Sequence, residues 1–128
     1  MNNIILMGEV FSGGGKGKKF VALDWVKQQI EQKLGFIPFP GTLNLKLSEE
    51  SFKHRGILEK ASSIRICPKI GYCIGKLIRA SIEIFDCAIV VPDIDGYPET
   101  LLEIISPVNL REKLQVYDGD EVTVVIQF

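Results

Sequence analysis

Hydrophobic and polar residues alternate along several short stretches of the chain. A period of two is typical of β-strands with one buried face, because successive side chains point to opposite sides of a strand. One face of residues 75–92 is expected to hold Ile78, Ala80, Ile82 and Ile84, and the other Arg79, Ser81 and Glu83. Strands are predicted within residues 4–11, 42–47, 62–71, 75–92, 101–106 and 117–128, the last after an Asp-Gly turn.

One segment has helical spacing instead, with apolar residues at Leu23, Val26, Ile30 and Leu34. We expect Asp24 to cap the start of this helix and Gly35 to end it. A shorter helical turn is predicted at 106–114, where Asn109 and Glu112 have the spacing of a capping box.

These elements predict a mainly β fold, a small β-barrel with one clear α-helix after the first strand and short helical turns. Residues 48–63 are polar and are interpreted as a surface excursion. A length of 128 residues suits one domain, so residues 1–128 are taken as a single unit.

Composition and charge exclude several classes of protein. Fifteen basic and sixteen acidic residues leave a net charge of −1, which argues against a general nucleic-acid coat. Cys67, Cys73 and Cys87 form no CxxC pair and the chain has one histidine, so we expect three thiols in a reducing compartment rather than a zinc site. The N-terminus carries no basic leader and only a short apolar run, which predicts a soluble, cytoplasmic protein.

A glycine-rich segment, SGGGKGKK at 12–19, joins the first strand to the helix. Glycines allow successive backbone N–H groups to form a concave anion-binding nest, to which Lys16, Lys18 and Lys19 add charge. A phosphate chain would suit such a nest, although the spacing is not that of a Walker A motif. Taken alone, a segment of this kind is more often a mobile surface loop with solvated lysines.

A rigid turn precedes the strand at 42–47, since Pro38 and Pro40 fix the backbone before Gly41. Thr42 and Asn44 then share one face of the strand. Their hydroxyl and amide oxygens are neutral, hard donors that suit a Mg²⁺ ion completed by water and phosphate oxygens. The alternative is a polar strand face that bonds to its neighbour.

A third candidate segment is ETLLEIISPVNLREKL, at 99–114. Glu103 could accept a hydrogen bond from a substrate or help to remove a proton, and Thr100 lies three residues before it. Backbone N–H groups of the turn at 108–111 could bind a base edge or phosphate. In isolation, a helix cap with surface charges is the better explanation of this segment.

Taken together and in this order, the segments resemble the archaeal CTP-dependent riboflavin kinases. The resemblance lies in GEVFSGGGKGKKF (8–20), PFPGTLNLKL (38–47) and LEIISPVNLREKL (102–114) followed by DGDEVTV (118–124). It spans the chain from Gly8 to Val124, and PGTLN is its most specific motif.

The resemblance implies a six-stranded cradle-loop β-barrel that transfers the γ-phosphate of CTP to riboflavin, giving FMN and CDP. It assigns Mg²⁺ to Thr42 and Asn44, and the flavin to Thr100 and Glu103, with Glu103 also a candidate base. Tyr72, Phe85 and Tyr97 are candidates to line the flavin slot. The nucleotide would be bound by Gly8, Glu9, Val10, Phe11, Ser12, Gly13, Gly15, Gly17, Lys18, Val108, Asn109, Leu110 and Arg111.

The expected partners are therefore the small molecules CTP and riboflavin, with no nucleic acid, no membrane and a monomeric chain. Two rival interpretations keep the barrel. One is a flavin or nucleotide sensor without catalysis, which would not need the Thr42 and Asn44 pair. The other is a DNA-binding barrel, which would need a basic face that the mixed charge does not supply.

Overall fold

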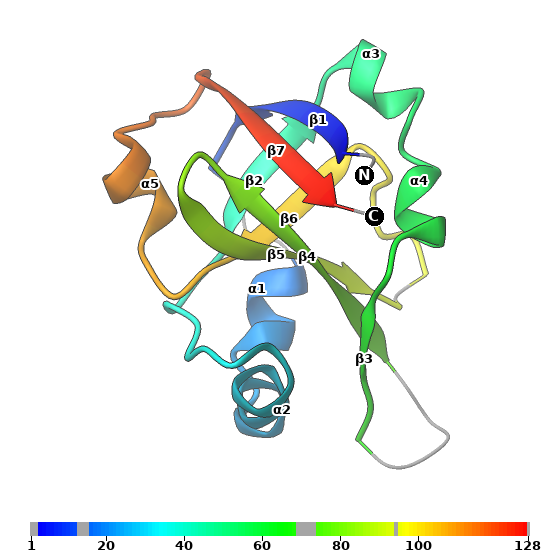
Figure 1. Cartoon of the computed structure of the whole chain (residues 1–128), viewed down its shortest axis with the longest axis vertical. Coiled ribbons are helices and arrows are strands. Elements are labelled where there is room, and N and C mark those ends of the chain that lie inside the picture. The colour runs from blue at the N-terminus through cyan, green and yellow to red at the C-terminus, as the bar shows by residue number, and fades with distance from the viewer. Residues whose placement is uncertain (1–2, 13–15, 69–73, 94, 128) are drawn as a thin grey trace.

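A computed structural model describes residues 3–12, 16–68, 74–93 and 95–127 (Figure 1). The strands are β1 (Asn3–Val10), β2 (Leu43–Leu47), β3 (Ile64–Ile66), β4 (Gly75–Ile82), β5 (Phe85–Pro92), β6 (Leu101–Ile105) and β7 (Glu121–Gln127). The helices are α1 (Lys16–Val21), α2 (Asp24–Leu34), α3 (Glu49–Phe52), α4 (Ile57–Lys60) and α5 (Leu110–Leu114). The prediction of a mainly β fold is confirmed.

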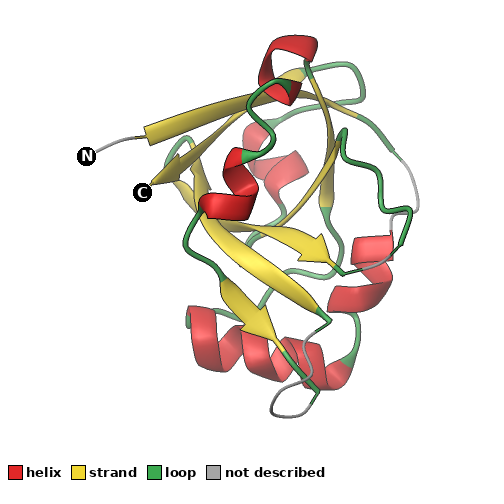
Figure 2. Cartoon of the chain, turned by 90° about the vertical axis from the view of Figure 1, so that its right-hand side faces the viewer, coloured by secondary structure: helices red, strands yellow, loops and turns green. Residues whose placement is uncertain are grey.

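All strand pairings in the described residues are antiparallel, in the order β3-β4-β5-β6-β2-β1-β7. A further pairing between β4 and β7, at Ser81 and Val125, closes six of these strands into a barrel and leaves β3 outside. The expected six-stranded barrel is therefore confirmed. Figures 1 and 2 show α1 and α2 together at one end of the molecule, beside β3, with α3 and α4 at a distance from them.

The barrel wall is buried on both sides where helices cover it. Cys87 and Ile89 of β5 belong to the apolar cluster inside the barrel, whereas Ala88 and Val90 pack with α1 and α2 on the outside. Burial on both faces explains why this part of the sequence is almost continuously apolar instead of alternating.

Helix α2 begins one residue earlier than predicted. Its N-cap is Leu23, which makes no side-chain cap bond, so the prediction of Asp24 as the cap is wrong. Asp24 is the first helical residue, where its negative charge favours the positive end of the helix dipole. Gly35 ends the helix as expected, with φ 83° and its N–H donating to the Glu31 carbonyl.

Two segments interpreted as loops contain helices. Residues 16–21 form α1, although residues 13–15 of the same segment lie outside the described part of the chain. Residues 48–63 hold α3 and α4, and Leu58 is fully buried in the barrel cluster, so this segment is not merely a polar excursion.

The stretch at 75–92 is two strands instead of one continuous alternation. Ile82 pairs with Phe85, and Glu83 has a left-handed φ of 52°. Ile84 is consequently at the tip of a hairpin and 89% exposed, so its predicted place on the apolar face is wrong. No Gly, Asn or Pro marks this turn in the sequence, which is why the alternation concealed it.

Strand β3 pairs with β4 on one side, and side chains of α2 bind the backbone on its other side. The Gln29 amide donates to the Cys67 carbonyl at 2.6 Å and accepts from the Cys67 N–H at 3.1 Å. Lys33 Nζ donates to the Arg65 carbonyl at 2.8 Å. Cys67 is disulfide-bonded, so the expectation of three thiols is wrong for this residue.

Cys87 is a free, buried thiol, as expected, and burial followed by the nearby charge of Asp86 raises its pKa to about 12. Among the described residues, no helix has the length and apolar character needed to cross a membrane.

The close approach of β1 to β2 requires glycine at position 8. A Cβ on Gly8 would lie 2.9 Å from the Leu45 Cβ and 3.0 Å from the Lys46 carbonyl oxygen. We therefore expect Gly8→Ala to lower the free energy of unfolding by about 1–3 kcal/mol, measured by urea denaturation. Gly56→Ala is the matched control, because no atom lies within 4 Å of a Cβ placed there. Equal unfolding midpoints for both variants would contradict this account.

Candidate functional site

The pairing of β2 with β6 brings the predicted metal and flavin residues together. Asn44 and Glu103 are direct partners in the antiparallel register. Leu43 and Leu45 pack inside the barrel, so Asn44 between them lies on the outer face of the wall. Both polar side chains are nevertheless buried, with Asn44 7% and Glu103 0% exposed.

Thr42 stands directly before β2 and completes this cluster. Its Oγ1 lies 2.8 Å from Asn44 Oδ1 and 3.3 Å from Glu103 Oε2. The prediction that Thr42 and Asn44 point to the same side is thus confirmed. Three oxygen-bearing side chains, from β2, β6 and the residue before β2, meet at one point, which neither segment could provide alone.

The spacing of the Thr42 and Asn44 oxygens fits a magnesium ion. In octahedral coordination at about 2.1 Å, neighbouring ligand oxygens are about 3 Å apart. The 2.8 Å between Thr42 Oγ1 and Asn44 Oδ1 is close to this value. The pair can therefore hold two adjacent positions of a Mg²⁺ shell, with the remaining positions left to water and phosphate oxygens.

Tyr97 holds the second oxygen of Glu103. Its hydroxyl donates to Glu103 Oε1 at 2.6 Å, a short, charge-assisted bond. Burial first, and then the bond to Glu103, raises the pKa of Tyr97 above its ordinary value, so the phenol stays protonated as a donor. The sequence placed Tyr97 among residues lining a flavin slot but gave no sign of this bond, since the turn at 95–100 has no periodic pattern.

A second polar cluster joins three segments that are distant in the sequence. Asp118 Oδ1 accepts from Ser12 Oγ at 2.8 Å and from Arg111 at 2.9 Å. The Ser12 bond, and then the Arg111 bond, lower the pKa of Asp118. Arg111 also reaches the Phe11 carbonyl at 3.5 Å. The sequence named Ser12, Phe11 and Arg111 for the nucleotide but missed Asp118, although the DGD turn that contains it belongs to the resembling motif.

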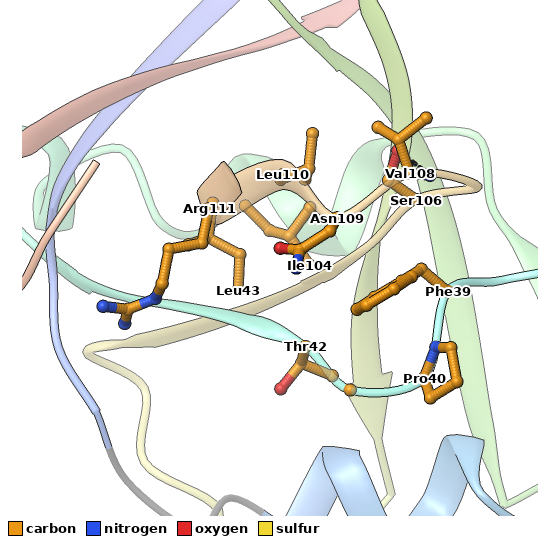
Figure 3. A pocket seen from close by; sticks show the side chains of 11 residues that line it. Phe39, Pro40, Thr42, Leu43, Ile104, Ser106, Val108, Asn109, Leu110 and Arg111 are labelled. Atoms are coloured by element: carbon orange, nitrogen blue, oxygen red, sulfur yellow. Dashed lines mark hydrogen bonds between the residues drawn. The ribbon is translucent and has the colours of Figure 1, made fainter. Parts of the chain in front are cut away.

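A pocket of about 120 Å³ lies between these two clusters. Figure 3 shows Phe39 and Pro40 on one side of it and Arg111 on the other, with Thr42 at its rim. Its lining is formed by Phe39, Pro40, Gly41, Thr42, Leu43, Ile104, Ser106, Val108, Asn109, Leu110 and Arg111. The volume is below the usual range for a whole ligand, so the pocket can take only part of one.

Local structure explains why the turn at 106–110 forms this wall. The Asn109 side chain accepts from the Glu112 N–H at 3.3 Å, which confirms the predicted cap of α5. Ser106 Oγ donates to the Asp86 carbonyl at 2.8 Å, and the Ser106 carbonyl accepts from the Phe39 N–H at 2.7 Å. These bonds tie both sides of the pocket to the barrel.

A larger pocket of about 490 Å³ lies beside Tyr97. It is lined by Arg55, Glu59, Arg65, Gly75, Lys76, Val91, Pro92, Asp93, Tyr97 and Glu99. Its volume is within the range of small-molecule sites. Tyr97 lines this pocket and also contacts Glu103, while Thr42 lies at the smaller pocket, so the oxygen cluster lies between the two.

The remaining predicted nucleotide residues are divided between core and surface. The Val10 side chain is 1% exposed in the barrel interior, and its N–H donates to Asp120. Gly8 is buried, Glu9 and Lys18 are exposed, and Gly17 lies in α1. Gly13 and Gly15 lie outside the described residues, and the nucleotide roles of all these positions stay predictions.

The other predicted flavin residues do not join the cluster. Thr100 is exposed, and its carbonyl accepts from the Leu47 N–H at 2.8 Å. Phe85 is partly buried and packs against the cluster inside the barrel, and it lines neither of the two pockets. Tyr72 lies outside the described residues. The flavin role of Thr100 stays a prediction.

Comparisons with known proteins give one family. The family model described as "CTP-dep_RFKase: Domain of unknown function DUF120" matches residues 10–126. The chain is 40% identical over 130 residues to the riboflavin kinase of Archaeoglobus fulgidus, covering 96% of this chain and 54% of that protein. It is 37% identical over 132 residues to that of Saccharolobus solfataricus, covering 98% and 75%.

The riboflavin kinase of Methanosarcina mazei is 42% identical over 121 residues, which cover 91% of this chain and 54% of that protein. The chain therefore spans about half the length of the Archaeoglobus and Methanosarcina relatives. The family model covers nearly the whole chain, and the chain also forms the expected six-stranded barrel. This chain therefore belongs to the CTP-dependent riboflavin kinase domain family.

Proposed function

We propose that this chain transfers the γ-phosphate of CTP to the 5′-hydroxyl of riboflavin, giving FMN and CDP. The observation that carries the proposal is the cluster of Thr42, Asn44 and Glu103 oxygens between two pockets. Two substrates in adjacent pockets would have their reacting groups at this cluster. The names of the relatives and of the family model support riboflavin as acceptor and CTP as donor.

The nucleotide belongs at the smaller pocket in this proposal. Val108, Asn109, Leu110 and Arg111 line it and would contact the base or ribose. The glycine-rich segment after β1 would enclose the phosphates, because Arg111 and Asp118 anchor its first residues at Phe11 and Ser12. The exposed Lys18 and Lys19 of α1 add positive charge near that segment.

Thr42 and Asn44 would hold Mg²⁺, which when bound neutralises charge on the transferring phosphate. Asn44 offers its carbonyl oxygen from a rigid strand, and the turn at Pro40 and Gly41 fixes Thr42 beside it. Neutral ligands leave the positive charge of the ion available to the phosphates, whereas carboxylate ligands would partly cancel it.

The flavin belongs at the larger pocket in this proposal. Val91, Pro92 and Tyr97 give it an apolar side, while Arg55 and Lys76 are polar groups at its edge. Glu103 would accept a hydrogen bond from the flavin or its ribityl chain. Since phosphoryl transfer depends mainly on positioning and charge neutralisation, we assign Glu103 first to binding and only second to proton removal.

The reaction itself is the first test. With riboflavin and Mg²⁺, the purified chain is expected to form FMN from CTP and little from ATP, measured by chromatography of the flavins. Heat-denatured protein is the control. Failure to form FMN with either nucleotide would contradict the proposed activity.

Replacement of Asn44 tests the metal site. Asn44→Leu keeps the volume but removes the ligand oxygen, so FMN formation is expected to fall by more than about 100-fold. Riboflavin affinity, measured by flavin fluorescence, should be largely unchanged. Lys46→Leu is the control, because Lys46 is exposed on the same strand. Equal losses of turnover and riboflavin binding in Asn44→Leu would indicate a structural role instead.

Replacement of Asp118 tests the anchoring of the glycine-rich segment. Asp118→Asn weakens the bonds to Ser12 and Arg111, which are solvent-exposed. We therefore expect the KM for CTP to rise by no more than about fivefold, with the KM for riboflavin unchanged. Glu121→Gln is the control, because Glu121 is an exposed carboxylate at the start of β7 and takes no part in these two bonds. A larger rise in the KM for riboflavin than in the KM for CTP would contradict the assignment of this cluster to nucleotide binding.

A further inference from the structure

The hydroxyl of Thr42 faces two acceptors but carries one proton. Thr42 Oγ1 is 2.8 Å from Asn44 Oδ1 and 3.3 Å from Glu103 Oε2. A hydroxyl donates one hydrogen bond and accepts with its lone pairs. The proton of Thr42 therefore points either to the amide oxygen or to the carboxylate, and the two orientations leave its lone pairs facing different directions.

Only one of these orientations is compatible with a cation on Thr42 and Asn44. If the proton points to Asn44 Oδ1, it occupies the space between the two oxygens that a shared cation would face. If it points to Glu103 Oε2, lone pairs of Thr42 Oγ1 and Asn44 Oδ1 both face the cation. A negatively charged acceptor also makes the hydroxyl oxygen a better ligand.

We propose that Glu103 is a positioning residue for the metal: it accepts a hydrogen bond from the Thr42 hydroxyl and thereby leaves lone pairs of the Thr42 and Asn44 oxygens facing a divalent cation. This inference rests on the metal site of the proposed function but adds a role for Glu103 that is separate from any contact with flavin.

Tyr97 makes this role possible by fixing the carboxylate. Its hydroxyl holds Glu103 Oε1 at 2.6 Å, which directs Oε2 to Thr42. The strand register adds to this restraint, because Glu103 pairs with Asn44 on one side and with Val90 on the other. Glu103 is fully buried, and each of its oxygens lies at hydrogen-bond distance from a hydroxyl. Its side chain therefore has little freedom to move Oε2 away from Thr42.

Binding of Mn²⁺, measured by electron paramagnetic resonance, tests the inference without turnover. The titration uses the full chain alone and with saturating CTP. Glu103→Gln is expected to weaken Mn²⁺ binding by about 10-fold or more, the usual effect of losing a group that orients a metal ligand. Glu31→Gln is the matched control, because Glu31 is an exposed carboxylate on α2 that lines neither of the two pockets.

A double-mutant cycle separates orientation from simple charge attraction. In a Thr42→Val background, Glu103→Gln should have little further effect on Mn²⁺ binding, because no hydroxyl remains to be turned. In a Thr42→Ser background the full effect should persist. If Glu103→Gln weakens binding equally in all backgrounds, the carboxylate acts through its charge alone and the proposal is wrong.

Tyr97→Phe provides a second cycle that does not depend on the folding of Glu103→Gln. Tyr97→Phe keeps the charge of Glu103. We expect it to weaken Mn²⁺ binding when residue 42 is Thr or Ser, and to have no effect in the Thr42→Val background. A wild-type chain that binds no Mn²⁺ in either condition would overturn the proposal. Mn²⁺ binding with the expected cycle but no FMN formation would count against the proposed function and not against this role of Glu103.

Discussion

The register between β2 and β6 is the constraint on which the candidate site depends. It sets Asn44 opposite Glu103. A slip of one residue would turn the amide into the barrel interior and expose the leucines on either side of it. Leu43, Leu45 and Leu47 prevent this slip, because all three pack in the apolar cluster inside the barrel. The hydrophobic core thus determines where the polar oxygens meet.

Burying a carboxylate and an amide in the barrel wall has a cost that local hydrogen bonds offset. Tyr97 donates to one oxygen of Glu103, and the Thr42 hydroxyl lies within hydrogen-bond distance of both the other oxygen of Glu103 and Asn44 Oδ1. In the described part of the chain, no buried side-chain nitrogen or oxygen lacks a partner. The polar cluster is therefore satisfied without a ligand, and a bound metal or substrate must exchange partners within it.

The sequence predicted the features that depend on nearby residues. Alternation located most strands, the Asn109 and Glu112 spacing located the cap of α5, and Gly35 marked the end of α2. The pairing of Thr42 with Asn44 also followed from strand period alone.

The features that the sequence did not reveal depend on contacts between distant segments. The bond from Tyr97 to Glu103 requires the turn before β6 to fold back over it. The bond from Ser12 to Asp118 joins residues 106 positions apart. The hairpin at Ile84 was concealed for a different reason, because its turn residues lack the usual signals.

Strand β3 affects how readily copies of this protein associate through the edges of their sheets. An edge strand usually offers a row of vacant backbone groups to which a strand of another molecule can add. Here the barrel is closed, β3 has only three residues, and Gln29 and Lys33 occupy backbone groups of Cys67 and Arg65 on its outer side. The outer side of β3 is thus a poor template for intermolecular sheet growth, which favours a dispersed protein even in concentrated solution.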